Sequence, residues 1–177
     1  MFNFNRTSNQ FVFRRNTVRN GRRVGVLYKG YRSWVDSNVF VGLGGGALEL
    51  WNAPYEGLFA ETVLFRNNTV RDVCQLSRGA APIWTSVPRP ESATTPANVH
   101  ADLRIEGNLF NTGPGPTFWL MDIHDVIITA NNVSYCSKAV VYPSGGVLNM
   151  SSNTGNVLFD PGSNVLHASE SPRLCLK

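Results

Sequence analysis

A short strand-like run, Ala47-Leu48-Glu49-Leu50-Trp51, holds the residue types of this chain that are best suited to chemistry. Its side chains alternate between apolar and other types, which is typical of a strand with one buried face. If Leu48 and Leu50 point inward, Glu49 and Trp51 share the outer face. A carboxyl group can exchange protons or bind hydroxyl groups, and an indole ring offers an apolar platform, so this pair suits a sugar. A solvated strand face beside a Gly-rich turn is the alternative interpretation.

Asn52 and Glu56 follow this run and would extend the same site. Glycoside hydrolases hold two carboxyl groups roughly 5–10 Å apart. Neighbouring strands of a stack are about 4.8 Å apart, so acids one or two strands apart satisfy this requirement. Glu49 could therefore pair with Glu56, or with Asp72 or Asp122 from other parts of the chain.

Asp122 and His124 form a second candidate cluster, in the segment Trp-Leu-Met-Asp-Ile-His-Asp. Strand alternation would place both side chains on one face, where the pair could position a general acid or base. A turn made of ordinary surface residues is the alternative. His100 and Asp102 form a similar but weaker pair. The chain has no HExxH, CxxC or EF-hand pattern, so its residues predict no metal cofactor.

Two further tryptophans, Trp84 and Trp119, stand in later strand-like runs. If these runs and the run that holds Tyr142 lie on units stacked next to Trp51, the four rings form a stripe that would support an extended polysaccharide. The alternative is that these rings point inward and belong to the core. At Trp119 the neighbouring Phe118 and Leu120 compete for the inside.

A recurring asparagine indicates the elements that must position these residues. It follows successive strand-like runs at intervals of 22, 30, 40, 24 and 21 residues. The positions are Asn16, Asn38, Asn68, Asn108, Asn132 and Asn153. The asparagine amide bonds to local backbone and tolerates the left-handed conformation of a sharp corner, and stacked asparagines can bond to one another. A repeat of this length indicates stacked units that share one continuous core.

Two long segments, 42–61 and 74–100, interrupt this repeat. In stacked-repeat proteins such insertions collect on one face, which is often the binding face. The first segment contains the glycine triplet 44–46, which permits a bend or a close backbone approach but lacks the pattern of a phosphate loop. Sustained helical periodicity is absent, so the chain is predicted to be all-β and to form one domain over 1–177.

This pattern resembles the right-handed parallel β-helix of the pectin-lyase-like superfamily, over about residues 10–165. The resemblance implies an all-β solenoid of about six coils with two long loop insertions. Many members of the superfamily are polysaccharide lyases, glycoside hydrolases, epimerases or phage tailspike proteins. A polysaccharide or oligosaccharide is therefore the ligand that the resemblance implies.

The resemblance leaves the type of reaction open. Hydrolases of the polygalacturonase type carry an Asp-Asp doublet, which this chain lacks. Lyases of the superfamily use a lysine or arginine base, often with calcium. Lys29 and Arg71 could serve by position, and calcium is the implied cofactor if the chain is a lyase. Members usually begin with a capping helix, which residues 1–10 do not contain, so uncapped ends predict a fragment or end-to-end homo-oligomers.

Composition and charge exclude some classes of protein. The chain is 42% hydrophobic and 16% charged, and none of its apolar runs approaches the roughly 18 residues of a membrane span. Its N-terminus lacks the apolar core of a signal peptide, and an extracellular or periplasmic location rests on fold analogy alone. Cys74, Cys136 and Cys175 lack metal-ligand spacing and are predicted to be reduced thiols.

The positive charge is concentrated near the N-terminus. Residues 1–33 contain eight basic residues and no acidic ones, whereas the remaining residues sum to −4. This end of the molecule is either a solvated end coil or a surface for an anionic polymer or a partner subunit. Nucleic acid is disfavoured as a partner, because the chain has no aromatic-stacking or groove-reading motif.

The sequence thus predicts a carbohydrate-binding β-helix protein with a groove along its axis. If the protein is a hydrolase or lyase, the predicted catalytic residues are Glu49, Glu56, Asp122 and His124. The predicted substrate-binding residues are Trp51, Asn52, Trp84, Trp119, Lys29 and Arg71. The alternative function is a non-catalytic glycan-binding or assembly module, similar to a tailspike or to a truncated enzyme core.

Overall fold

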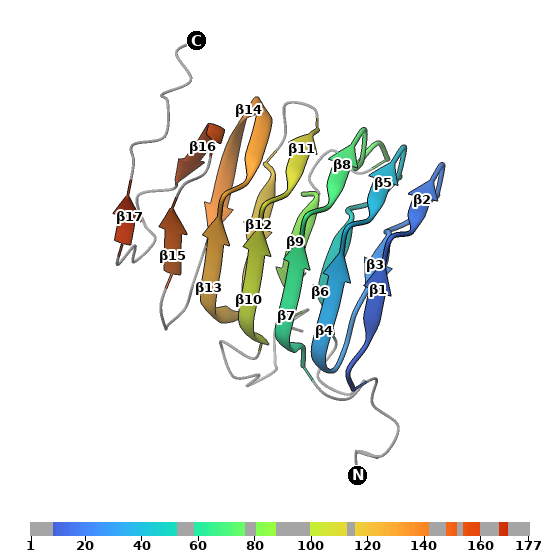
Figure 1. Ribbon diagram of the computed structural model, residues 1–177, viewed down its shortest axis with the longest axis horizontal. Helices are drawn as coiled ribbons and strands as arrows, with labels where there is room; N and C mark the ends of the chain where they lie inside the picture. Colours follow the sequence, from blue (N-terminus) through green and yellow to red (C-terminus); the bar gives the residue numbers. More distant parts are fainter. Residues whose placement is uncertain are drawn as a thin grey trace, which may run out of the picture.

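The computed structural model describes the backbone in eight stretches: 9–52, 59–76, 81–87, 100–112, 116–141, 148–151, 154–159 and 167–169. Side chains are described as far as Ser134. Strands make up all the regular structure of these residues, and their pairings are parallel. The strands stack in chain order from β1–β3 at one end to β15–β17 at the other (Figure 1). The parallel β-helix predicted by the repeat is therefore confirmed.

The strands form three faces, which we call sheets A, B and C. Sheet A contains β1 (Val12–Arg14), β4 (Tyr31–Asp36), β7 (Glu61–Arg66), β10 (His100–Glu106), β13 (Ile123–Thr129), β15 (Leu148–Ser151) and β17 (His167–Ser169). Sheet B contains β2 (Thr17–Arg19), β5 (Val39–Val41), β8 (Thr69–Arg71), β11 (Leu109–Asn111), β14 (Asn132–Val141) and β16 (Thr154–Phe159). Sheet C contains β3 (Val26–Leu27), β6 (Leu48–Trp51), β9 (Ile83–Ser86), β12 (Phe118–Leu120) and the second half of β14, which joins it to sheet B.

Each coil passes through sheets A, B and C in that order, so β1–β3 form the first coil and β4–β6 the second. Most inward positions are aliphatic or aromatic, and they form a single buried cluster that runs through the coils, with Phe11, Phe13 and Val18 partly buried at the first coil. Phenylalanine rings stack within it at centroid distances of 6.3 Å for Phe13–Phe40, 5.9 Å for Phe40–Phe65 and 6.5 Å for Phe65–Phe110. This stack explains how short strands form a stable core, because each ring is buried between rings of adjacent coils.

The corner between sheets A and B holds the predicted asparagine ladder. The members are Asn16, Asn38, Asn68, Asn108 and Asn131. From Asn38 onward, each side-chain oxygen accepts the backbone N–H of the asparagine in the preceding coil, at 2.8–3.0 Å. The residue before each asparagine is left-handed, with φ between 53° and 61°.

One rung of the ladder was assigned wrongly from the sequence. Asn131 is the buried rung in the fifth coil, whereas Asn132 is exposed at the start of β14. The adjacent asparagines fit the same pattern, and only the hydrogen bonds between coils distinguish them. The predicted Asn153 lies outside the described residues.

The glycine triplet lies at the corner between sheets B and C, where successive coils touch. A Cβ atom on Gly44 would lie 2.1 Å from the carbonyl oxygen of Arg22, and one on Gly46 would lie 2.7 Å from that of Ala81. These positions exclude any side chain because backbone lies against backbone. The triplet therefore serves coil packing at this corner.

Candidate functional site

The candidate site is the outer surface of sheet C, here called the sheet C face. It is made of Leu27, Lys29, Glu49, Trp51, Trp84 and Trp119. Leu48 and Leu50 of β6 are buried, while Glu49 is half-buried and Trp51 exposed. The prediction that Glu49 and Trp51 share an outer face is therefore confirmed.

Strand register aligns Glu49 with residues of the neighbouring coils. Glu49 pairs with Leu27 of β3 on one side and with Trp84 of β9 on the other. Trp84 pairs in turn with Trp119 of β12, and their rings stack with centroids 6.1 Å apart and planes 28° apart. The carboxyl group of Glu49 thus lies in a column of otherwise apolar side chains.

The predicted alignment of the three tryptophans in one stripe is only partly correct. Trp84 and Trp119 are aligned, but Trp51 pairs with Ser86 and stands two residues further along its strand. The two long segments begin and end at the coil corners, so the sequence does not reveal the phase between β6 and β9. Trp51 therefore follows Glu49 by two residues on the same strand, whereas Trp84 and Trp119 are in register with Glu49 on the next two strands of sheet C.

Trp51 has a different neighbour on each side. The ammonium nitrogen of Lys29, from the first coil, lies 5.5 Å from the centre of the Trp51 ring. Ser86, from the third coil, is the small residue on the other side. Trp51 is 37% exposed. A cation on one ring face and a small residue on the other leave room for a flat apolar ligand surface against this ring.

Burial raises the pKa of the Glu49 carboxyl group above its ordinary value. A half-buried carboxyl group flanked by leucine and tryptophan loses hydration, which disfavours its charged form. Cys74, at the nearby corner, is affected as well: burial and then the Glu49 charge raise the pKa of its thiol to about 12. The thiol therefore stays protonated and is a poor nucleophile at neutral pH.

Asp122 and His124 do not share a face, contrary to the prediction. Asp122 is left-handed (φ 54°) and buried at the corner between sheets C and A, where its carboxylate accepts the backbone N–H of Val87 at 3.1 Å. His124 lies on the outside of sheet A, with Nδ1 2.6 Å from Oδ2 of Asp125. The left-handed corner breaks the alternation that the prediction assumed.

His100 is the histidine that lies near Asp122. It is fully buried, its Nδ1 accepts the backbone N–H of Ala60 at 3.0 Å, and Phe59 packs edge-on against its ring. Burial lowers the pKa of His100 to about 4, although the Ser86 backbone and the Asp122 charge act in the opposite direction. His100 is thus a neutral residue that fixes the corner between two coils, and Asp102 lies outside this corner on sheet A.

The remaining predicted site residues are dispersed. Asn52 is fully buried and so does not face a ligand at the surface, because it follows the outward Trp51 by one residue and turns into the corner. Arg71 is exposed on sheet B, in register with Val41 and Asn111. Glu56 and Tyr142 lie outside the described residues. Leu27, which the sequence reading missed, is 50% exposed beside Glu49, and only the coil register reveals it.

The described residues contain neither a metal-ligand group nor a membrane-spanning helix. The described residues contain no group of three or more histidine, cysteine, aspartate or glutamate side chains that could hold a metal ion. Within the same stretches, no helix is long and apolar enough to cross a membrane.

Comparisons with known proteins identify the fold. Searches of curated proteins and of solved structures gave no match. The family model described as a right-handed beta helix region matches residues 2–172, which is nearly the entire chain. The three parallel faces, the coil-to-coil asparagine ladder and this match agree, and the chain therefore belongs to the right-handed β-helix family.

Proposed function

We propose that this chain is a carbohydrate-binding β-helix protein whose ligand lies across the sheet C face. The observation that carries the proposal is the position of Glu49, a half-buried carboxyl group in register between Leu27 and Trp84. Placing a carboxyl group among apolar neighbours is unfavourable for the fold alone. Such a group beside an exposed indole is well suited to bind the hydroxyl groups of a sugar while the ring contacts its apolar face.

The residues of this face favour a neutral sugar chain. A carboxylated sugar would bring a second negative charge next to Glu49. Trp51 would contact one sugar ring, and the stacked Trp84 and Trp119 would support the next part of an extended chain along the axis. Lys29 would keep the Trp51 ring in place through its contact with the ring face.

Binding is better supported than two-carboxylate hydrolysis. Glu49 is the single carboxylate on the described part of the sheet C face, and Asp122 is turned into a corner. A hydrolase would need a second acid near Glu49, and Glu56 and Asp72 stay the predicted candidates. Turnover is therefore a separate outcome of the test below.

The test compares paired variants for binding to neutral glycans. Wild type, Glu49→Gln and Trp51→Ala would be titrated calorimetrically with cellohexaose, laminarihexaose and xylohexaose. Glu61→Gln and Trp34→Ala are the matched controls, because Glu61 is exposed and Trp34 is 50% exposed on sheet A. We expect at least one glycan to bind, and each sheet C variant to weaken it about tenfold, which corresponds to ~1.4 kcal/mol. Equal weakening by the controls, or no binding to any neutral glycan, would refute the proposal.

Turnover would be followed on these neutral glycans and on polygalacturonate, through reducing ends and the ultraviolet absorbance of unsaturated sugars. New reducing ends alone indicate a hydrolase, and both signals together indicate a lyase. If the wild type turns over a glycan, Glu49→Gln should abolish turnover while the fold is retained. A fully active Glu49→Gln variant would remove Glu49 from any catalytic role.

A further inference from the structure

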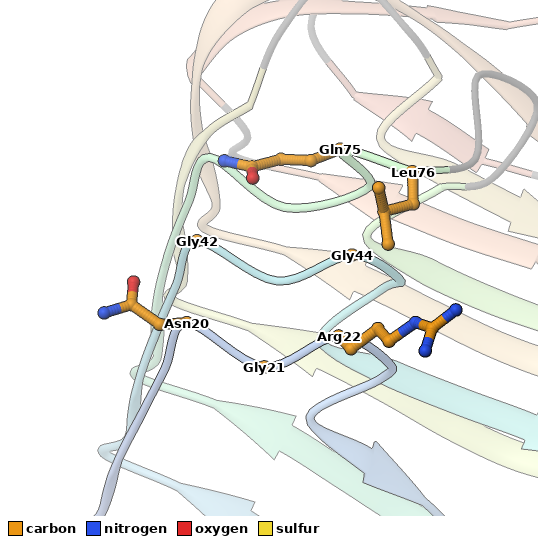
Figure 2. A pocket seen from close by; sticks show the side chains of 7 residues that line it. All are labelled: Asn20, Gly21, Arg22, Gly42, Gly44, Gln75 and Leu76. Atoms are coloured by element: carbon orange, nitrogen blue, oxygen red, sulfur yellow. The ribbon is translucent and has the colours of Figure 1, made fainter.

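A second surface feature lies away from the sheet C face, at the corner between sheets B and C. It is a shallow hollow of about 410 Å³ that spans the first three coils. Figure 2 shows three stacked segments: 20–22 below, Gly42 and Gly44 in the middle, and Gln75 with Leu76 above. The middle segment contributes no side chains, so the hollow is bounded by the side chains of the coils on either side.

The shape of this hollow is fixed by coil packing. Gly42 is left-handed (φ 64°), and a Cβ atom there would lie 2.9 Å from Oδ1 of Asn20. A Cβ atom on Gly44 would collide with the Arg22 backbone, and Leu43 between the two glycines is fully buried. A side chain at Gly44 would require the coils to move, and the left-handed backbone at Gly42 favours glycine, so the shelf between the first and third coils stays bare.

The glycine shelf offers a ligand neither the Gly42 nor the Gly44 backbone N–H group. The backbone N–H of Gly42 bonds to the carbonyl of Arg71, and that of Gly44 bonds to the carbonyl of Gly21, so neither donor is available to a ligand. The exposed polar side chains at the rim are Asn20, Arg22 and Gln75. Leu76, which is 70% exposed, adds an apolar contact.

Two more arginines lie next to this corner, at the ends of strands of sheet B. Arg19 ends β2 and Arg71 ends β8, and both are exposed. They pair with Val41 from opposite sides, so they stand two strands, or about 10 Å, apart. Ion pairs formed within the described stretches do not include Arg19, Arg22 or Arg71. One carboxylate, Asp72, follows Arg71, so the corner keeps a net positive charge.

We propose that this corner is a second glycan site, which binds the carboxylate or sulfate groups of a linear acidic polysaccharide. Guanidinium groups bind such oxyanions through paired hydrogen bonds, and amide side chains suit the adjacent hydroxyl groups. The spacing of Arg19 and Arg71 fits anionic groups that repeat along a chain. Among the described residues that line the hollow there is no aromatic ring on which a base could stack, which favours a glycan over nucleic acid.

The test uses affinity electrophoresis or calorimetry at low and moderate salt. The probes are polygalacturonate, dextran sulfate, uncharged dextran and a mixed-sequence single-stranded DNA. We expect wild type to bind at least one acidic glycan and not dextran, and Arg22→Gln/Arg71→Gln to bind about tenfold more weakly. Arg15→Gln/Arg32→Gln is the matched control, because it removes the same charge from exposed residues elsewhere. Leu76→Glu places an acid at the rim and should also weaken binding.

The outcomes distinguish binding at this corner from binding at the sheet C face and from non-specific electrostatic attraction. Preference for polygalacturonate or for dextran sulfate identifies the recognised group as carboxylate or sulfate, and either supports the proposal. Glu49→Gln and Trp51→Ala should leave this binding unchanged. Three results would overturn the proposal. They are an equal loss of acidic-glycan affinity in the two double variants, DNA binding as tight as acidic-glycan binding, and no binding of either acidic glycan. The substituted arginines and Leu76 are exposed, so circular dichroism should show a retained fold for these variants.

Discussion

At the scale of single residues, Glu49 is the carboxyl group whose burial is unfavourable for folding and which we propose to bind the ligand. Its carboxyl group is half-buried between apolar neighbours, and burial raises its pKa. Residues retained at such cost often serve function, since a fold selected for stability alone would replace them. This property can be tested without knowing the ligand.

We predict that Glu49→Gln stabilises the fold at neutral pH. A raised folded-state pKa means that the stability contribution of this group is present in acid and is lost as pH rises through the folded pKa. The neutral glutamine avoids this loss, so the variant should be more stable than wild type at pH 7.5, by less than about 1 kcal/mol because the site is partly solvated. Near pH 4 the difference should vanish. Urea unfolding at both pH values measures it.

The control for this prediction is Glu61→Gln, an exposed carboxylate on β7. It makes the same replacement at an exposed position, so it reports the effect of the substitution in the absence of burial. If Glu49→Gln is less stable than wild type at pH 7.5, the carboxylate makes a favourable contact and the argument from burial is wrong.

At the scale of elements, the corner between sheets A and B combines two requirements at adjacent positions. One residue must be left-handed, and Arg15, Ser37, Asn67, Gly107 and Ala130 fill that position. The next must be the asparagine that bonds to both neighbouring coils. Since only glycine and asparagine adopt the left-handed conformation readily, the ladder must hold the other residue types in it.

We predict that Asn68→Ala destabilises the protein by about 3 kcal/mol. The Asn68 oxygen accepts from the backbone and the side chain of Asn38, and its amide group donates to the Val35 carbonyl and to Asn108. Removing the side chain leaves a buried donor and a buried acceptor unsatisfied. Urea denaturation would report the change.

Asn132→Ala is the matched comparison for the ladder. Asn132 is exposed at the start of β14, one residue after the buried rung. Its replacement should change the free energy of unfolding by no more than about 0.5 kcal/mol. Comparable effects of the two substitutions would show that the ladder does not carry the stability of this corner.

At the scale of the whole molecule, His100 makes stability depend on pH in mild acid. Its folded pKa is about 4 against an ordinary 6.5, so the unfolded chain takes up the proton first. The contribution is fully present above pH 6.5 and is lost as pH falls toward 4. The maximum size of this loss is about 3 kcal/mol. His100→Asn, which keeps an acceptor near Ala60, should be less stable at pH 7.5 and much less sensitive to pH in this window.

His124→Asn is the control for the pH experiment, because His124 lies on the outside of sheet A. Comparing the two variants assigns the acid sensitivity either to the buried imidazole of His100 or to the outer imidazole of His124, which contacts Asp125. A His100→Asn variant with the same dependence as wild type would assign the acid sensitivity to other groups.

Local chemistry made a large part of this protein predictable. The asparagine repeat indicated the β-helix, because a left-handed corner and a stacking amide demand that residue type at coil-length intervals. Alternation within β6 correctly placed Glu49 and Trp51 outside, since adjacent residues of one strand point to opposite faces. Both inferences depend only on residues close in sequence or on the period of the repeat.

Only the tertiary structure decided which residues meet between coils. The strand register aligned Trp84 with Glu49 and not with Trp51. The left-handed backbone at Asp122 placed the Asp122 and His124 side chains on different faces. Lys29 and Arg71, which sequence reasoning grouped together, lie on different faces. The physical reason is that side chains alternate between the inner and outer faces only within one strand. At each corner, a single left-handed residue or an insertion of any length changes which residues of the next strand face outward.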